Sequence, residues 1–230
     1  NWKQHQKANF SWWIENMKST LSMVDILRID HFIGFVHFWM VSYGSRTAKC
    51  GKWKKAPGME LFTTLKSQLG DIEIIAEDLG YKTCEVDQLM KKMNFPGMKL
   101  LQEGVIGGCD HPFAPQNYKS SKCVVYTSTH DSEPLRAWFL NLNNANKKNV
   151  LHLLKCNTKE VAKKMIELAW SSKAIYAIAQ MQDILELGGE SRMNVPGTKK
   201  GNWQWRLKRN YIQDKTIQWL RDVTRQYKRL

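Results

Sequence analysis

The sequence predicts an α/β protein in which short parallel strands alternate with helices. Three short runs rich in β-branched or other apolar residues, at 26–30, 72–77 and 123–129, each lead into a carboxylate. Helix-length stretches separate them, and this alternation is typical of βα units around a parallel sheet. Catalytic side chains of an α/β barrel sit at the C-terminal ends of its parallel strands, so these three ends form the candidate site.

The carboxylates at the three strand ends favour glycoside chemistry. They are Asp30, Glu77 and Asp131. A retaining reaction needs a carboxylate nucleophile and a second carboxyl group that acts first as acid and then as base. A further anion can stabilise the positive charge of the transition state. A lone aspartate at a strand end more often caps the next helix, but three carboxylates in this order are harder to explain in that way.

Longer motifs make the interpretation specific. In chain order they are Arg28-Ile29-Asp30-His31-Phe32, Gly51-Lys52-Trp53, Ala56-Pro57-Gly58, Ala76-Glu77-Asp78-Leu79-Gly80, Phe95-Pro96-Gly97-Met98-Lys99, Tyr126, Thr129-His130-Asp131, Gln182-Asp183, Arg192-Met193-Asn194, Pro196-Gly197-Thr198 and Gly201-Asn202-Trp203. Over nearly its whole length the chain resembles the C-terminal half of the 4-α-glucanotransferases (amylomaltases or disproportionating enzymes) of glycoside hydrolase family 77.

The resemblance implies roles for the strand-end residues. Asp30 would be the nucleophile, Glu77 the general acid/base and Asp131 the transition-state stabiliser. Arg28 resembles the arginine that keeps the nucleophile ionised. A cation two residues earlier on the same strand face would favour the charged carboxylate. His130 resembles the histidine that contacts sugar hydroxyls.

Further residues are expected to bind substrate, namely Trp53, Pro57, Gly58, Asn202 and Trp203. The two tryptophans are favoured because each falls in a Gly-containing segment that we expect to be a loop, and aromatic faces stack on sugar rings. The stretches 54–58 and 192–201 are also predicted to be loops, from their Pro and Gly content. Trp12, Trp13, Trp138 and Trp170 fall in helical stretches and are expected to pack. Asp78 is expected to form structural hydrogen bonds, because alternation points it away from Glu77.

The resemblance also implies the fold, a partial TIM (β/α)8 barrel. Five strands, around 26–30, 72–77, 97–102, 123–129 and 174–181, would be strands four to eight, followed by C-terminal helices. A complete barrel takes about 250 residues. We therefore expect residues 1–230 to be the C-terminal part of a catalytic barrel, with the N-terminal half of the same protein absent and needed as a partner.

Composition indicates the redox state and the cellular location of the protein. Five widely spaced cysteines without a Cys-x-x-Cys pair predict a reduced, cytoplasmic protein, or a plastid one if the source is a plant or alga. No signal peptide and no apolar run long enough to span a bilayer is visible. The resemblance implies no metal or organic cofactor, and α-1,4-glucan and maltooligosaccharides as substrates.

Two alternatives stay open. The net charge of +14 is compatible with a basic nucleic-acid-binding module. However, Ile217, Leu220, Val223 and Tyr227 recur at helical spacing, which favours a basic amphipathic surface helix. A non-catalytic remnant that still binds glucan is the other alternative.

Three departures from the family pattern bear on that remnant hypothesis. Ile33 stands where an arginine is usual, Ser128 where a glycine is usual, and Ser132 where an asparagine is usual. They leave the three carboxylates intact and are expected to alter contacts around them.

Overall fold

The computed structural model describes residues 1–229, and its contacts divide the chain into two compact units, Asn1–Met98 and Lys99–Leu230. Five parallel strands, β1 (Leu27–Ile29), β4 (Ile74–Ala76), β5 (Gly97–Leu100), β6 (Cys123–Tyr126) and β7 (Tyr176–Ile178), follow the order β1-β4-β5-β6-β7. Each lies inside one of the five predicted strands. The predictions ran too far at two ends, because Leu101 begins α5 and Met181 begins α9.

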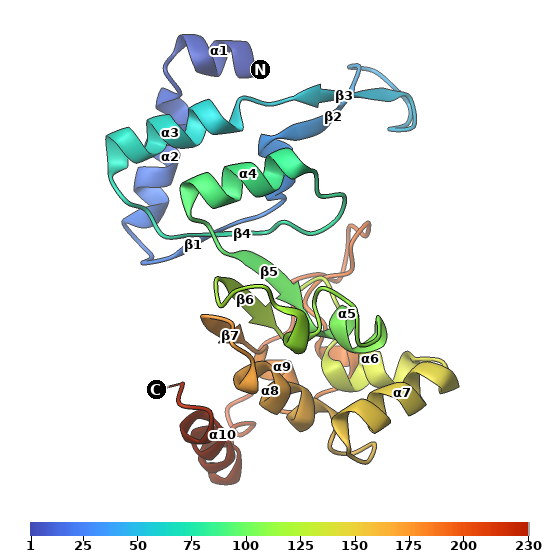
Figure 1. The fold of residues 1–230 in the computed structure, drawn as a ribbon. Helices are drawn as coiled ribbons and strands as arrows, with labels where there is room; N and C mark the ends of the chain where they lie inside the picture. Colours follow the sequence, from blue (N-terminus) through green and yellow to red (C-terminus); the bar gives the residue numbers. More distant parts are fainter. Residues whose placement is uncertain (230) are drawn as a thin grey trace. The chain divides into compact units, whose positions relative to one another are not determined.

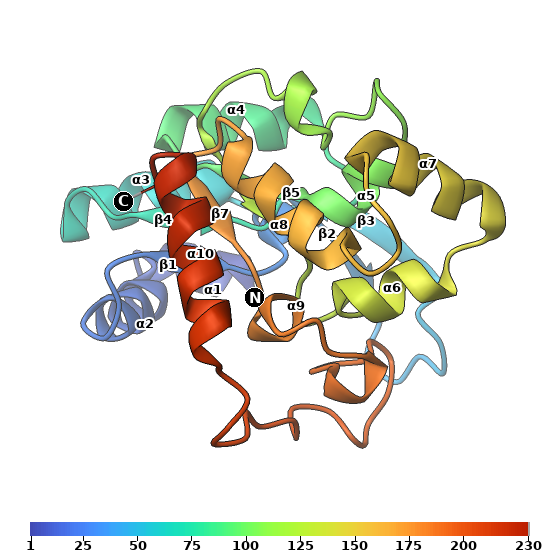
Figure 2. The ribbon, with the colours of Figure 1, turned by 90° about the horizontal axis from the view of Figure 1, so that it is seen from below.

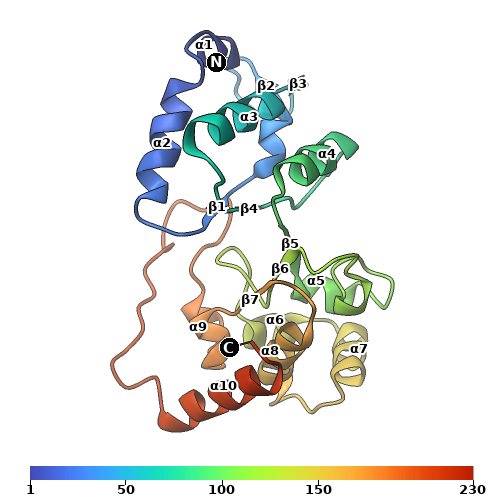
Figure 3. The same ribbon diagram turned by 60° about the vertical axis from the view of Figure 1, so that its left-hand side comes forward.

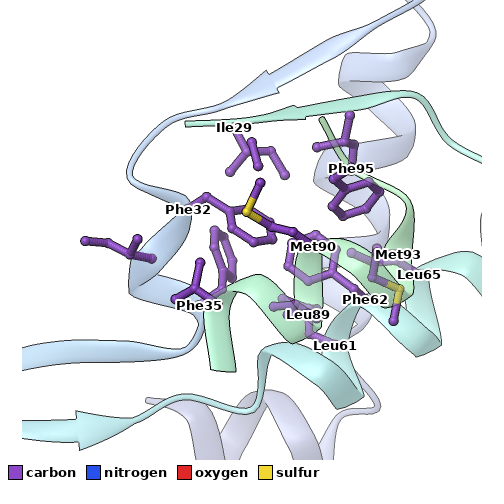
Figure 4. Close-up of a cluster of buried hydrophobic side chains, with 14 of the residues drawn as sticks. Ile29, Phe32, Phe35, Leu61, Phe62, Leu65, Leu89, Met90, Met93 and Phe95 are labelled. Atoms are coloured by element: carbon purple, nitrogen blue, oxygen red, sulfur yellow. The ribbon is translucent and has the colours of Figure 1, made fainter. Parts of the chain in front are cut away.

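The first unit packs helices against its strands. β1 and β4 pair in parallel, with Arg28 opposite Ile75. The helices are α1 (Trp2–Lys7), α2 (Ser11–Leu21), the short η1 (Phe32–Phe35), α3 (Gly58–Leu69) and α4 (Cys84–Met93). α3 contacts both α2 and α4. The core beneath β1 is aromatic: Phe32 and Phe62 are almost fully buried, and their ring centroids lie 5.3 Å apart (Figure 4).

A β-hairpin in this unit was not predicted. β2 (His37–Val41) and β3 (Gly51–Lys55) pair antiparallel and extend beyond η1 (Figure 1). Trp39 stands opposite Trp53, and their rings meet edge to face at 5.5 Å, the kind of cross-strand pair that stabilises a hairpin. The predicted loop at 54–58 is therefore wrong at both ends, because β3 ends at Lys55 and α3 begins at Gly58. Trp53 lies on a strand and not in a loop.

The second unit is mainly helical. Its elements besides β6 and β7 are α5 (Leu101–Ile106), η2 (Pro115–Asn117), α6 (Leu135–Asn141), α7 (Asn144–Leu154), α8 (Val161–Ser171), α9 (Met181–Ile184), η3 (Gly189–Ser191) and α10 (Asp214–Gln226). α8 contacts α6, α7 and α10, and so forms the centre of this helical layer (Figure 3). The predicted loop at 192–201 is confirmed, since no helix or strand is assigned there.

The predicted C-terminal amphipathic helix is confirmed as α10, which lies beside α8 (Figure 2). Val223 is buried, and Trp170 Nε1 donates a hydrogen bond to Thr224 Oγ1 at 3.2 Å. The apolar face is incomplete because Ile217 is 46 % exposed. Among the described residues, no helix combines the length and the apolar character that crossing a bilayer requires.

The tryptophan predictions hold with one exception. Trp13 packs against the core of the first unit, and Trp138 and Trp170 pack against the core of the second. Trp12 was also expected to pack, and it does so only in part, because 55 % of it is exposed. Trp12 instead sits on the outer side of α2 and meets Trp13 edge to face at 4.9 Å.

Gly97→Ala should destabilise the first unit. A Cβ at Gly97 would lie 2.6 Å from Asp78 Oδ1, which accepts a hydrogen bond from the Met98 N–H. We expect the free energy of unfolding in urea to fall by about 1–3 kcal/mol, the usual cost of overpacking. Gly189→Ala is the control, since its Cβ would meet nothing closer than 3.7 Å. Equal effects of the two substitutions would contradict the expectation.

Candidate functional site

Asp30 follows β1 directly and carries an exposed carboxylate. Its side chain is 72 % exposed, and Arg28 Nη1 lies 2.8 Å from its Oδ1. Arg28 and Asp30 share a strand face because side chains alternate along a strand. The predicted pairing of this cation with this carboxylate is therefore present. Arg28 is itself held by a contact from its Nε to Met98 Sδ at 3.4 Å.

Glu77 follows β4 and is buried, with 8 % of its surface exposed. Its carboxylate accepts hydrogen bonds from two backbone amides, His31 N at 2.7 Å and Leu79 N at 2.9 Å. Its own backbone N–H donates to Ile29 O at 2.9 Å, and its carbonyl accepts from Phe32 N at 2.9 Å. Glu77 is thus bonded to the residues on both sides of Asp30, so the ends of β1 and β4 are fixed relative to each other.

His31 has a strained backbone that serves this arrangement. Its φ of +47° lies in the left-handed region, which is uncommon for a residue other than glycine. This conformation accompanies the hydrogen bond from the His31 N–H to the Glu77 carboxylate. Strain of this kind concentrates at functional sites, where the surrounding structure has to hold it.

The predicted structural role of Asp78 is confirmed. Asp78 is buried and accepts hydrogen bonds from Met98 N at 2.8 Å and from Lys82 Nζ at 2.6 Å. Burial of the ammonium opposes its charge, but Asp78 and Asp87 outweigh this and raise the pKa of Lys82. Asp78 therefore connects β4 to β5 and to the segment before α4.

In the second unit, His130 and Asp131 follow β6 and are held by the loop after η3. His130 Nε2 lies 3.3 Å from Asp131 Oδ2, and Asn194 Nδ2 donates to Asp131 Oδ1 at 2.6 Å. Arg192 Nη2 donates to the backbone carbonyl of Asp131 at 2.6 Å. The Trp203 ring lies 5.2 Å from that of His130 and is 53 % exposed. Three residues predicted for the site, His130, Asp131 and Trp203, therefore form one cluster.

A buried carboxylate, Asp183, organises the residues just before this cluster. Its Oδ2 accepts hydrogen bonds from the hydroxyls of Thr127 (2.7 Å) and Ser128, and its Oδ1 accepts from Leu135 N at 2.7 Å. Burial raises the pKa of Asp183, although these hydrogen bonds act in the opposite direction. Gln180 Nε2 donates to both Ser128 Oγ at 2.5 Å and Thr129 O at 2.8 Å. The hydroxyl of Ser128 thus both donates and accepts a hydrogen bond in this network.

The remaining predicted binding residues have structural contacts of their own. Gly58 is buried, and a Cβ there would lie 2.2 Å from Phe35 O. Pro57 caps α3, since its carbonyl accepts from Leu61 N at 2.9 Å. Asn202 braces its own loop, accepting from Val195 N at 3.0 Å. Substrate contact by these three residues stays a prediction.

Sequence reasoning assigned no role to three residues whose hydrogen bonds hold the carboxylates or the backbone beside them. Asn194 and Gln180 act by side-chain amides, and His31 acts by its backbone N–H. Asn194 and Gln180 are remote in sequence from the groups they hold, so no local pattern could reveal them. Among residues 1–229, no group of three or more His, Cys, Asp or Glu side chains could hold a metal ion.

Comparisons with known proteins show the family of the chain. Residues 1–212 match the glycoside hydrolase family 77 model, described as 4-alpha-glucanotransferase. The chain is similar to the 4-alpha-glucanotransferase of Clostridium butyricum, with 43 % identity over all of this chain and 47 % of the relative. It is 41 % identical to the chloroplastic/amyloplastic 4-alpha-glucanotransferase of Solanum tuberosum, over all of this chain and 40 % of that one.

A solved structure agrees with the fold. The amylomaltase from Streptococcus agalactiae in complex with acarbose superposes with a TM-score of 0.94 at 36 % identity, covering 99 % of this chain and 46 % of that one. The predicted partial barrel is thereby confirmed. The chain spans about half the length of the curated relatives it matches.

The raised pKa of Asp183 predicts a pH-dependent stability. The folded state binds the Asp183 proton more tightly than the unfolded state, so ionisation of this buried group costs stability. That cost grows as the pH rises from the ordinary value of 3.8 through the raised folded-state value, and is constant above it. Asp183→Asn keeps an acceptor for Leu135 and removes the charge. Its stability relative to the wild type should therefore increase across this window.

Urea unfolding of both proteins between pH 3.5 and pH 8 measures this difference. Asp110→Asn, at an exposed aspartate of the same unit, controls for the loss of one charge. A stability difference between Asp183→Asn and wild type that does not change with pH, or that moves in favour of the wild type as the pH rises, would refute the expectation.

Proposed function

The chain belongs to glycoside hydrolase family 77, the 4-alpha-glucanotransferases, and from this premise we propose that it is the C-terminal part of such an enzyme, with a retaining mechanism. The acceptors would be glucose or other glucans, and the donors α-1,4-glucans or maltooligosaccharides. The observation that carries the proposal is the linkage of Glu77 to both neighbours of Asp30. It gives one exposed and one buried carboxylate in a fixed relation.

The two carboxylates differ as a double displacement requires. Asp30 is exposed and paired with Arg28, which suits a nucleophile that must be charged when it attacks. One Asp30 oxygen would attack the anomeric carbon while the bond to the leaving 4-oxygen breaks and Glu77 supplies that oxygen with a proton. The hydroxyl of an acceptor would then attack the glycosyl ester, giving its proton to Glu77 and releasing Asp30. Configuration is retained because two inversions occur.

The cluster on the second unit would serve the same reaction. Asp131 would stabilise the oxocarbenium-like charge, with its orientation held by Asn194 and Arg192. His130 would bind sugar hydroxyls, and the exposed face of Trp203 would stack on a glucosyl ring. Pro57, Gly58 and Asn202 remain proposed contacts, as does Trp53, which lines a pocket that neither Asp30 nor Glu77 lines. These roles rest on family membership together with the contacts of each residue.

Activity would need the additional segment that the relatives carry. Apolar side chains along and beside β7 are open: Ile175 is 45 %, Tyr176 42 % and Ile178 37 % exposed. Within the described residues, β7 pairs with β6 alone. A further strand would cover such a surface, and the N-terminal half of the protein is the proposed partner. We place the enzyme in the cytoplasm or, as for the relative from Solanum tuberosum, in a plastid.

Asp30→Asn should abolish transfer while leaving the fold intact, because an amide cannot form the glycosyl ester. We expect the rate of maltotriose disproportionation to fall by at least about a thousandfold in the extended protein, meaning this chain joined to the segment its relatives carry in addition. Asp25→Asn, at an exposed aspartate before β1, is the matched control. Mass spectrometry of the wild type with a slowly released fluoro-glucosyl donor should locate the adduct on Asp30. An adduct on another residue would refute the assignment.

The 230-residue chain alone should be oligomeric or poorly soluble and should have little or no activity, because the surface beside β7 is open. Incubation with maltotriose, followed by chromatography of the products, tests the activity, and light scattering tests the state of association. Joining the additional segment should give a monodisperse, active protein. Ready formation of glucose and longer maltodextrins by a monodisperse 230-residue sample would contradict this prediction.

A further inference from the structure

A pocket of about 240 Å³ lies in the first unit, between the β2–β3 hairpin and the start of α4. Its lining includes Ile33, His37, Trp53, Tyr81, Thr83 and Glu85. Neither Asp30 nor Glu77 lines it, and neither does any residue that hydrogen-bonds to them. We propose that this pocket is an accessory site that binds one glucosyl ring of an α-glucan. The choice of glucan rests on the proposed function.

Two aromatic side chains give the pocket its walls. Trp53 is 59 % exposed and Tyr81 is 81 % exposed, so both rings are accessible to a ligand. The edge-to-face contact with Trp39 fixes the Trp53 ring from the neighbouring strand. Aromatic rings offer a flat apolar surface that packs on the C–H face of a pyranose ring. The walls therefore suit a sugar better than they suit an ion.

Two polar groups of the pocket lie close enough to share one hydroxyl. His37 Nε2 lies 3.9 Å from Glu85 Oε1, beyond hydrogen-bond distance. A sugar hydroxyl to one side of this pair could accept from an imidazole N–H and donate to the carboxylate. Lys55 Nζ lies 3.5 Å from the same Glu85 Oε1. Thr83 Oγ1 is buried and has no hydrogen-bond partner among the described residues, so it is a further polar group that a sugar hydroxyl could meet.

The size of the pocket selects a single ring. Its volume falls below the range of about 300–1,000 Å³ that is typical for drug-sized ligands, so one glucosyl unit would enter and the rest of the chain would extend outward. Ile33, which is 9 % exposed, contributes apolar surface.

Binding can be tested separately from catalysis, in the extended protein carrying Asp30→Asn. The His37 ring signal can be assigned in a carbon–proton NMR spectrum of that protein by its loss in His37→Gln. Titration with maltose should shift that signal saturably. Tyr81→Ala should weaken the binding read at His37 by at least about fivefold, because it removes a stacking face. Tyr81→Phe keeps the ring and should bind nearly as well as the parent.

Tyr43→Ala is the matched control, since Tyr43 is fully exposed in the hairpin turn and does not line the pocket. Equal effects of Tyr43→Ala and Tyr81→Ala would overturn the proposal, as would a His37 signal that maltose does not move. A shift with indole but not with maltose would assign the pocket to an apolar ligand and also overturn it. Failure of the proposed function would appear elsewhere, as absence of a glycosyl adduct on Asp30, and would leave the titration readable.

Discussion

The hydrogen bonds of Glu77 are the constraint on which the first unit depends. Its carboxylate accepts from His31 and Leu79, and its backbone pairs with Ile29 and Phe32. All four partners act through backbone atoms. Backbone donors do not change rotamer, so the orientation of this buried carboxylate follows from the fold itself and not from other side chains. Asp30 lies between two of the bonded residues, so its backbone is held in place. Its side chain is paired with Arg28 and remains exposed to a ligand.

The aromatic core connects the hydrogen bonds of Glu77 to the packing of the rest of the unit. Phe32 donates its N–H to Glu77 and buries its ring against Phe62 and Phe95. One residue therefore takes part in both the site and the core. α3 can approach η1 because Gly58 has no side chain that would clash with Phe35 O. A larger residue at position 58 would push α3 away, loosen the packing around Phe32, and so disturb the strand end that Glu77 closes. In this way a glycine outside the carboxylate pair contributes to its geometry.

The sequence allowed the five parallel strands, the strand-end carboxylates and the role of Asp78 to be predicted, because these follow from local runs and strict alternation. The β2–β3 hairpin could not be recognised, since β3 contains three lysines and a glycine, and its only strong signal is the pairing of Trp53 with Trp39 across the turn. Contacts between residues that are far apart in the sequence could not be predicted either. Asn194 reaches Asp131 over 63 positions, and that separation leaves no periodic signal. The exposure of Trp12 was not predicted, because helical spacing predicts a helix but does not show which of its tryptophans faces the solvent.

Each unit pairs an exposed carboxylate with a buried one. In the first unit, Asp30 is exposed and Glu77 is buried; in the second, the side chain of Asp131 is 46 % exposed, and Asp183 is buried and bonded to residues on either side of it in sequence. A buried carboxylate is costly unless donors satisfy it, and Asp183 obtains its donors from Thr127, Ser128 and Leu135. The departure at Ser128 thus adds a donor to this group rather than disrupting the strand end. Because Gln180 then fastens Ser128 and Thr129 together, the change leaves the backbone leading to Asp131 fixed. The serine in this motif thus helps to hold the backbone on which the position of the Asp131 carboxylate depends.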